Sequence, residues 1–241
     1  MKGGLIMDNK YLEATRMLNY NSVKLQNLIQ TRRWNTLDEY DKIKAIYNYV
    51  QNEILFGYNR EDTLTAEQVL LDGYGQCNTK ATLLMALLRG VGIPCRVHGS
   101  EVSKEFQRGE TSAFIAALAP SLIVHTWAEV LYNGQWLALE GVITDKKYVE
   151  SIKKKFSYVS GEFKKYAIAT NNFEQLSIDW VGKSTYVQNA AVIHDFGVFP
   201  NPDTFFSEHT QSWGKVKQFM YANIGRWLMN YNVNKERNRL N

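Results

Sequence analysis

Apolar residues recur at helical spacing over the first third of the chain. The clearest stripe lies within residues 36–54 and consists of Tyr40, Ile43, Ile46, Tyr47, Val50 and Ile54. It predicts an amphipathic helix, which Asp38 or Thr36 can cap. Thr65 and Gln68 have the spacing of a capping box and predict a brief helix there. Residues 11–30 carry apolar positions at mixed spacing and predict one or two short helices.

A glycine-rich turn, residues 73–76, leads into a second apolar stripe of Ala81, Leu84, Leu87 and Leu88. This stripe predicts a helix that starts near Cys77 and is stopped by Gly90 and Gly92. Cys77 then lies in the first helical turn, where unpaired N–H groups and the helix dipole stabilise an anion. A thiolate is such an anion and is the reactive form of cysteine. The alternative is that Cys77 is a small buried residue at a loop–helix junction.

Strand patterns dominate the middle of the chain. The strongest covers residues 122–139 and contains Asn133-Gly134 as a two-residue hairpin turn. Residues 93–98 predict another strand, with Pro94 at its start. We expect residues 100–121 to form an inserted helical or irregular excursion, residues 146–166 to be partly helical, and residues 180–198 to form one or two short strands.

An amphipathic helix is predicted over residues 210–232. Its stripe consists of Val216, Phe219, Met220, Ile224 and Trp227. We expect this stripe to dock on the protein's own core, as most amphipathic helices do. A helix that lies on a membrane surface has the same pattern and stays open as an alternative.

The hairpin register places a histidine beside a carboxylate. A two-residue turn pairs Tyr132 with Gln135 and, further out, sets Trp127 opposite Glu140 and His125 opposite Val142. Alternation then puts His125 and Glu140 on one face as diagonal neighbours, about 7–8 Å apart at the backbone. A carboxylate bonded to one ring nitrogen fixes the tautomer of the imidazole and supports its charge. The alternative is a solvent-facing pair.

These features resemble the transglutaminase-like superfamily of papain-related cysteine acyl-transfer enzymes. The resemblance covers residues 41–140 and lies in the stretches Asp41–Val50, Ala66–Leu71, Gly75–Cys77, Leu83–Arg89, Gly92–Arg96, His125–Val130 and Trp136–Glu140. It implies an α+β fold with a papain/transglutaminase-like core. In that core the nucleophile begins a helix packed on an antiparallel sheet, which carries the histidine and the carboxylate.

By the same resemblance, Cys77 is the nucleophile, His125 the base and Glu140 the orienting carboxylate. The family usually has aspartate at the third position, and Asp145 is the lesser candidate for it. The implied reaction is acyl transfer or hydrolysis of an amide through a thioester, with an amidase, peptidase or cross-linking outcome left open. The Cys77 N–H would meet the oxyanion together with Gln76, Tyr58 or Trp34.

Composition excludes several other classes of protein. The 241 residues, 45% hydrophobic and 22% charged, suit one globular domain over 1–241, with its core at about 41–140. The net charge of +4 has its only dense basic cluster at the C-terminus, so no nucleic-acid partner is expected. No signal peptide and no apolar membrane span are visible, and two cysteines form no disulfide framework. A cytoplasmic location is therefore predicted, with a protein, peptide or small amide as substrate and no cofactor.

Two rival functions remain. One is a catalytically silent binding or scaffolding protein on the same fold, because fold alone does not fix function. The other is a zinc site of Cys77, Cys95, His98 and His125, although Cys77 and Cys95 are eighteen residues apart and lack the short spacing of zinc knuckles.

Overall fold

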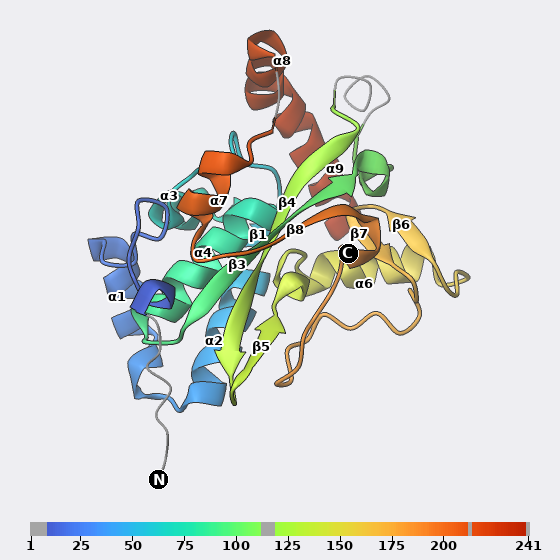
Figure 1. Ribbon diagram of the computed structural model, residues 1–241. Coiled ribbons are helices and arrows are strands. Elements are labelled where there is room, and N and C mark those ends of the chain that lie inside the picture. Colours follow the sequence, from blue (N-terminus) through green and yellow to red (C-terminus); the bar gives the residue numbers. More distant parts are fainter. Residues whose placement is uncertain (1–8, 112–118, 212–213, 240–241) are drawn as a thin grey trace.

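The computed structural model describes residues 9–111, 119–211 and 214–239. A four-stranded antiparallel sheet in the order β5-β4-β3-β8 runs through the middle of the molecule (Figure 1). Its strands are β3 (Cys95–Ser103), β4 (Leu122–Tyr132), β5 (Gln135–Ala138) and β8 (Val192–Phe199). Two pairs of short strands lie outside it: β1 (Leu55–Phe56) with β2 (Tyr74–Gly75), and β6 (Phe163–Lys165) with β7 (Ile168–Thr170).

Most of the first helices lie on one side of this sheet (Figure 1). They are η1 (Asn9–Tyr11), α1 (Val23–Thr31), η2 (Trp34–Thr36), α2 (Glu39–Asn52), α3 (Ala66–Asp72) and α4 (Cys77–Gly90). Helix α4 is buried along nearly its whole length, between β4 and the helices α2 and α3. The first core is the apolar cluster around α4, and it includes Leu25, Ile29, Ile46, Leu84, Leu88, Val124, Ala128 and Val130.

The other side of the sheet is covered by later parts of the chain. They include η3 (Lys104–Gln107), α6 (Lys146–Lys155), η5 (Asn189–Ala191) and α9 (Arg226–Arg237), whereas the short turn η4 (Glu140–Val142) contacts α2 and α4. Helix α7 (Pro202–Glu208) instead packs on the first core. The second core is the apolar cluster on this other side, and it includes Phe56, Cys77, Val102, Phe106, Ile143, Tyr148, Ile152, Phe163, Met229 and Val233.

Several predicted elements are confirmed, with their caps. Asp38 caps α2 by accepting from the Asp41 N–H, and Thr65 forms the predicted capping box with Gln68. Cys77 is the first residue of α4, as the glycine-rich turn predicts. Asn133 and Gly134 both have positive φ, 48° and 76°, as a type I′ hairpin turn requires.

The hairpin is shorter than its pattern predicts. Tyr132 pairs with Gln135, as expected, but the ladder stops where Glu129 pairs with Ala138. The chain then turns into η4, and Leu139 bridges to Thr185 instead of continuing the strand. The predicted pairing of His125 with Val142 is therefore wrong. Periodicity could not show this end, because the contact that draws the chain away comes from a distant loop.

Two further predictions need correction. Residues 100–103 belong to β3, so the predicted excursion begins later than expected; its residues 112–118 lie outside the described residues. The predicted helix of residues 210–232 is α8 (Lys215–Met220), a π-helical turn η6 (Tyr221–Gly225) and α9. Its predicted stripe does not dock on the core, because Val216, Phe219, Ile224 and Trp227 are all exposed. No helix within the described ranges is long and apolar enough to cross a membrane.

Candidate active site

A tight turn fixes Cys77 at the start of α4. Gly73 ends α3 in the left-handed conformation, with φ 70°. A Cβ on Gly75 would lie 2.7 Å from Thr79 Oγ1 and 2.9 Å from Lys80 Cγ, so only glycine fits at this position. The Gln76 N–H donates to Thr79 Oγ1 at 3.0 Å and leads the chain into the helix. The Cys77 N–H then belongs to the first helical turn, whose N–H groups have no acceptor within the helix.

The residues beside Cys77 tie it to the surrounding elements. The Gln76 side chain accepts from the Asn59 N–H at 2.8 Å and donates to Asp62 Oδ1 at 3.0 Å. Asn78 donates to the Val124 carbonyl and accepts from Thr126 Oγ1, both at 3.0 Å. Asn78 therefore bonds to the residues of β4 on either side of His125, which fixes the nucleophile's helix against the histidine's strand.

His125 and Glu140 form a buried pair. The two side chains are fully buried, and His125 Nε2 lies 2.9 Å from Glu140 Oε1. Glu140 Oε2 accepts from the backbone N–H groups of Val187, Gln188 and Asn189 at 2.9, 3.1 and 3.1 Å. Three N–H groups and an imidazole therefore complement the carboxylate charge in a place that water does not reach.

The three backbone N–H groups that donate to Glu140 could not be predicted from the sequence. They come from the start of η5 and the two residues before it, 47–49 residues after Glu140. Backbone N–H groups leave no signature in a sequence, because every residue except proline has one. Glu140 is reached as predicted, although it lies in η4, past the end of β5.

The surroundings of His125 raise its pKa and so favour the imidazolium. Burial disfavours the imidazolium, but the charge of Cys77 and then that of Glu140 outweigh it and raise the pKa of His125 to about 10. Since Nε2 faces Glu140, Nδ1 is the nitrogen left for the thiol. Within the described part of the chain Nδ1 is buried and makes no other hydrogen bond. The raised pKa favours an imidazolium at His125, and its positive charge lies near the Cys77 sulfur.

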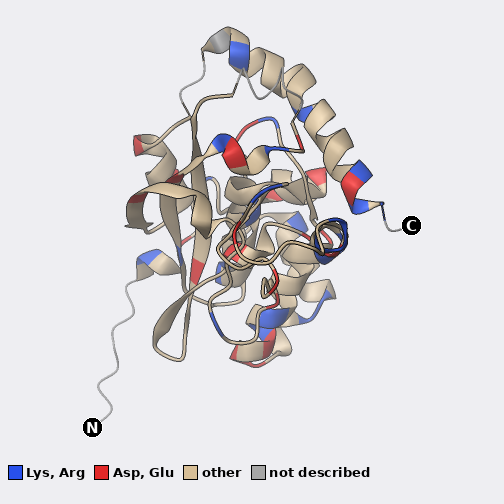
Figure 2. Cartoon of the chain, turned by 90° about the vertical axis from the view of Figure 1, so that its right-hand side faces the viewer, with Lys and Arg blue, Asp and Glu red and all other residues tan. Residues whose placement is uncertain are grey.

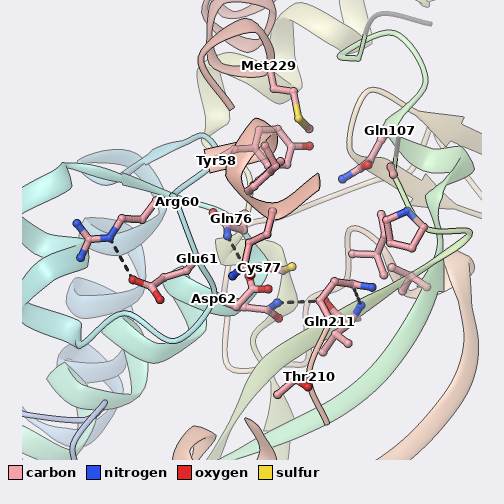
Figure 3. Close-up of a pocket in the computed structure, with 18 of the residues that line it drawn as sticks. Tyr58, Arg60, Glu61, Asp62, Gln76, Cys77, Gln107, Thr210, Gln211 and Met229 are labelled. Atoms are coloured by element: carbon pink, nitrogen blue, oxygen red, sulfur yellow. Dashed lines mark hydrogen bonds and ion pairs between the residues drawn. The ribbon is translucent and has the colours of Figure 1, made fainter. Parts of the chain in front are cut away.

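Cys77 opens onto a pocket of about 280 Å³. Figure 3 shows Cys77 below Tyr58 and Met229, with Gln107 and Gln211 across the cavity. The apolar walls include Phe56, Tyr58, Val102, Phe106, Ile123 and Met229. Side-chain amides of Gln76, Asn78, Gln107, Gln188, Gln211 and Gln218 also line it. Arg60, Glu61 and Asp62 line it as well, so the pocket combines apolar walls with amide and charged groups.

The three predicted oxyanion donors lie in different places. Gln76 lines the pocket beside Cys77 and uses one hydrogen of Nε2 for Asp62. Tyr58 also lines it, but its hydroxyl donates to Glu110 Oε2 at 2.7 Å. Trp34 is buried in the first core against Tyr49 and does not line the pocket. Gln76 is therefore the donor best placed to assist the Cys77 N–H.

Asp145 does not take part in this site. It caps α6 by accepting from the Tyr148 N–H at 2.9 Å, and it pairs with Arg237 Nη2 at 2.8 Å. The lesser candidate for the third position is therefore a structural residue.

The predicted zinc ligands are scattered. Cys95 is fully buried with its sulfur 3.5 Å from the Met85 carbonyl, and burial raises its pKa. His98 lies between Glu129 and Asp195, at 2.9 and 2.7 Å. The described residues contain no group of three or more His, Cys, Asp or Glu that could hold a metal ion.

Comparison with known proteins agrees with this geometry. A family model described as the transglutaminase-like superfamily matches residues 27–141. This segment belongs to the transglutaminase-like superfamily. It contains all three predicted site residues, Cys77, His125 and Glu140. The fold is the predicted α+β, papain/transglutaminase-like one, with a nucleophile helix packed on an antiparallel sheet.

One solved structure is also similar. It is a protein from Cytophaga hutchinsonii that is provisionally named a cysteine protease, with a TM-score of 0.44 and 16% sequence identity. The similarity covers 80% of this chain and 47% of that one, so the chain spans about half the length of that structure. No curated protein matches the chain.

Proposed function

We propose that this protein is a cysteine-dependent enzyme that forms a thioester between Cys77 and the acyl group of an amide substrate. The observation that carries the proposal is the position of His125, with Nε2 bonded to Glu140 and Nδ1 left for the thiol. A nucleophile, a base and an orienting group in this order are the requirement for nucleophilic catalysis. The cysteine-dependent family supports the same chemistry.

The reaction has two halves. The Cys77 thiolate attacks the amide carbonyl, and the Cys77 N–H and Gln76 stabilise the oxyanion. His125 gives its Nδ1 proton to the departing amine as the C–N bond breaks, which leaves the thioester. Water or a second amine then gives a proton back to Nδ1 and attacks the thioester, and the Cys77 thiolate is released. With water the outcome is hydrolysis; with an amine it is acyl transfer.

Alkylation with iodoacetamide tests the proposal without knowledge of the substrate. At pH 6 we expect Cys77 to react faster than a free thiol, whose pKa is about 8.5. Cys95 should react only after the protein is unfolded, because it is fully buried. Peptide mass spectrometry assigns the modified cysteine. His125→Asn is the control variant and should return Cys77 to the pH dependence of an ordinary thiol.

A failed test would favour the silent binding protein. If Cys77 reacts no faster than Cys95, or its reactivity does not depend on His125, the activated nucleophile is excluded. If Cys77 is activated, intact-mass detection of an acyl-enzyme with a set of amides and aryl esters identifies the acyl group. Adding a primary amine then separates hydrolysis from transfer.

A further inference from the structure

The C-terminal rod, formed by α8, η6 and α9, exposes large apolar side chains to solvent. Six of the fourteen exposed large hydrophobic residues among the described residues lie on this rod. They are Val216, Phe219, Ile224, Trp227, Leu228 and Tyr231, each between 47% and 73% exposed, and they are called the outer face below. In Figure 1 the α8 end of the rod projects beyond the end of the sheet.

The outer face is one continuous surface. Ile224, Trp227, Leu228 and Tyr231 have the 3-, 4- and 7-residue spacing of a single α-helical face. Phe219 precedes Ile224 by five residues, which is one turn across the π-helical segment η6. The opposite side, with Gly225, Met229, Val233 and Arg237 four residues apart, is buried against the body. Packing on the protein's own core therefore does not explain the outer face.

The charged residues of the rod are basic as far as Lys235. From His209 to Lys235 the chain contains no Asp or Glu, whereas it contains Lys215, Lys217, Arg226 and Lys235. The Arg226 guanidinium lies 4.3 Å from the ring centre of Trp227. Figure 2 shows the rod with blue segments and no red until its last turn. Trp, Phe and Leu on a helical segment whose own charged residues are basic as far as Lys235 are typical of helices that lie in the interface of an anionic bilayer.

We propose that the outer face binds the surface of a membrane that contains anionic lipids. The apolar residues span positions 216–231, about 24 Å of helix, which is long enough for interfacial binding along the rod. The face lies on a projecting rod whose charged residues are basic as far as Lys235, so it matches an anionic lipid surface.

The same rod reaches the pocket. Gln218, Tyr221 and Met229 line the cavity that contains Cys77. Membrane binding would therefore place the rod between the lipid surface and this wall of the pocket. Binding itself does not depend on the chemistry of Cys77, so the two proposals can fail separately.

Vesicle sedimentation tests the proposal. The full chain is mixed with phosphatidylcholine vesicles with and without about 30% phosphatidylserine, and the bound fraction is measured. We expect binding to the anionic vesicles that weakens in high salt. Phe219→Ser/Trp227→Ser should weaken it at least tenfold. Ile193→Ser/Val198→Ser is the matched control, because both residues are exposed on β8, outside the rod, and it should bind as the wild type does.

A second variant removes charge only. Lys217→Gln/Lys235→Gln should weaken binding about fivefold for each lysine, and these exposed positions do not endanger folding. Absence of binding to anionic vesicles, or equal binding by the wild type and both rod variants, overturns the proposal. Light scattering tests whether a second copy of the chain binds the outer face instead. If the protein is a dimer that does not bind lipid, and Phe219→Ser/Trp227→Ser makes it monomeric, then the outer face is an interface between two copies.

Discussion

The two cores on either side of the sheet are built in different ways. The first core is built mainly by the apolar stripes of the N-terminal helices α1 to α4, and residues of β3, β4 and α7 complete it. The second core gathers residues from Phe56 to Val233, and buried carboxylates lie within or beside it. There Asp145 pairs with Arg237, while Glu110 accepts hydrogen bonds from Tyr58 and Tyr148.

The candidate site lies where the two cores meet. Helix α4 belongs mainly to the first core and positions Cys77 at its N-terminus. The backbone N–H groups that bond to Glu140 lie on the side of the second core. Tyr58 and Met229, which form walls of the pocket, also belong to the second core. Local patterns thus position Cys77, and long-range polar contacts position Glu140 and the walls of the pocket. The expected effects of the following substitutions test this difference, from the largest to the smallest.

Arg237→Met should be the most damaging change to the second core. Arg237 is 3% exposed, donates to both oxygens of Asp145 and to the Phe56 carbonyl, and ties the end of α9 to α6 and β1. Its loss leaves a buried carboxylate without its counter-charge, which typically costs about 3–5 kcal/mol. The measurement is urea unfolding at pH 7.

Arg239→Met is the control for this prediction. Arg239 is exposed and pairs with Glu236 on the surface, so its loss should cost about 0–1 kcal/mol. Equal losses for the two variants would show that the second core does not depend on its buried ion pair.

Glu110 gives the second core a pH dependence. Burial raises its pKa from 4.5 to about 7, against the hydrogen bonds from Tyr148 and Tyr58 and the charge of Arg237. The folded protein therefore binds a proton that the unfolded chain releases at lower pH. Its contribution to stability is complete below pH 4.5 and is lost as the pH rises to about 7, by up to about 3 kcal/mol.

Glu110→Gln keeps a neutral side chain at every pH. Relative to the wild type, this variant should be more stable at pH 8 than at pH 5, as measured by unfolding at both values. Glu105→Gln, at an exposed position in the neighbouring η3, serves as the control and should follow the wild type. A constant stability difference for Glu110→Gln across this range would contradict the prediction.

Glu140→Gln should slow the alkylation of Cys77 at pH 6. Glu140 holds the His125 ring through Nε2, which leaves Nδ1 and its positive charge for the thiol, and a neutral amide holds that ring less firmly. Glu129→Gln is the matched control, because Glu129 bonds to His98 on the same sheet and not to His125. If both variants react like the wild type, Glu140 does not support the site.

The sequence was most informative where structure depends on nearby residues. Caps, turn glycines and helical stripes predicted α2, α3, α4 and the hairpin, and they placed Cys77 correctly at the start of a helix. The support of Glu140 could not be predicted, because backbone N–H groups donate it from a loop about 47 residues away. The prediction that the apolar stripe of the rod docks on the core was wrong for a related reason. A stripe shows which residues share a helical face, but it does not show whether another part of the protein covers that face.

Thr65→Ala tests the local construction of the first core and should have the smallest effect. The Thr65 hydroxyl accepts from the Gln68 N–H at 3.3 Å, while Gln68 Oε1 accepts from the Thr65 N–H at 2.9 Å. Loss of a cap of this kind costs about 1 kcal/mol. Thr63→Ala, two residues earlier and outside the cap, should cost less than half of this in the same urea unfolding experiment. The alkylation rate of Cys77 should stay at the wild-type value in Thr65→Ala, because the hydrogen bonds of Gln76 and Asn78, and not the cap of α3, hold the residues beside Cys77. A rate that falls with Thr65→Ala would mean that the reactivity of Cys77 depends on this cap.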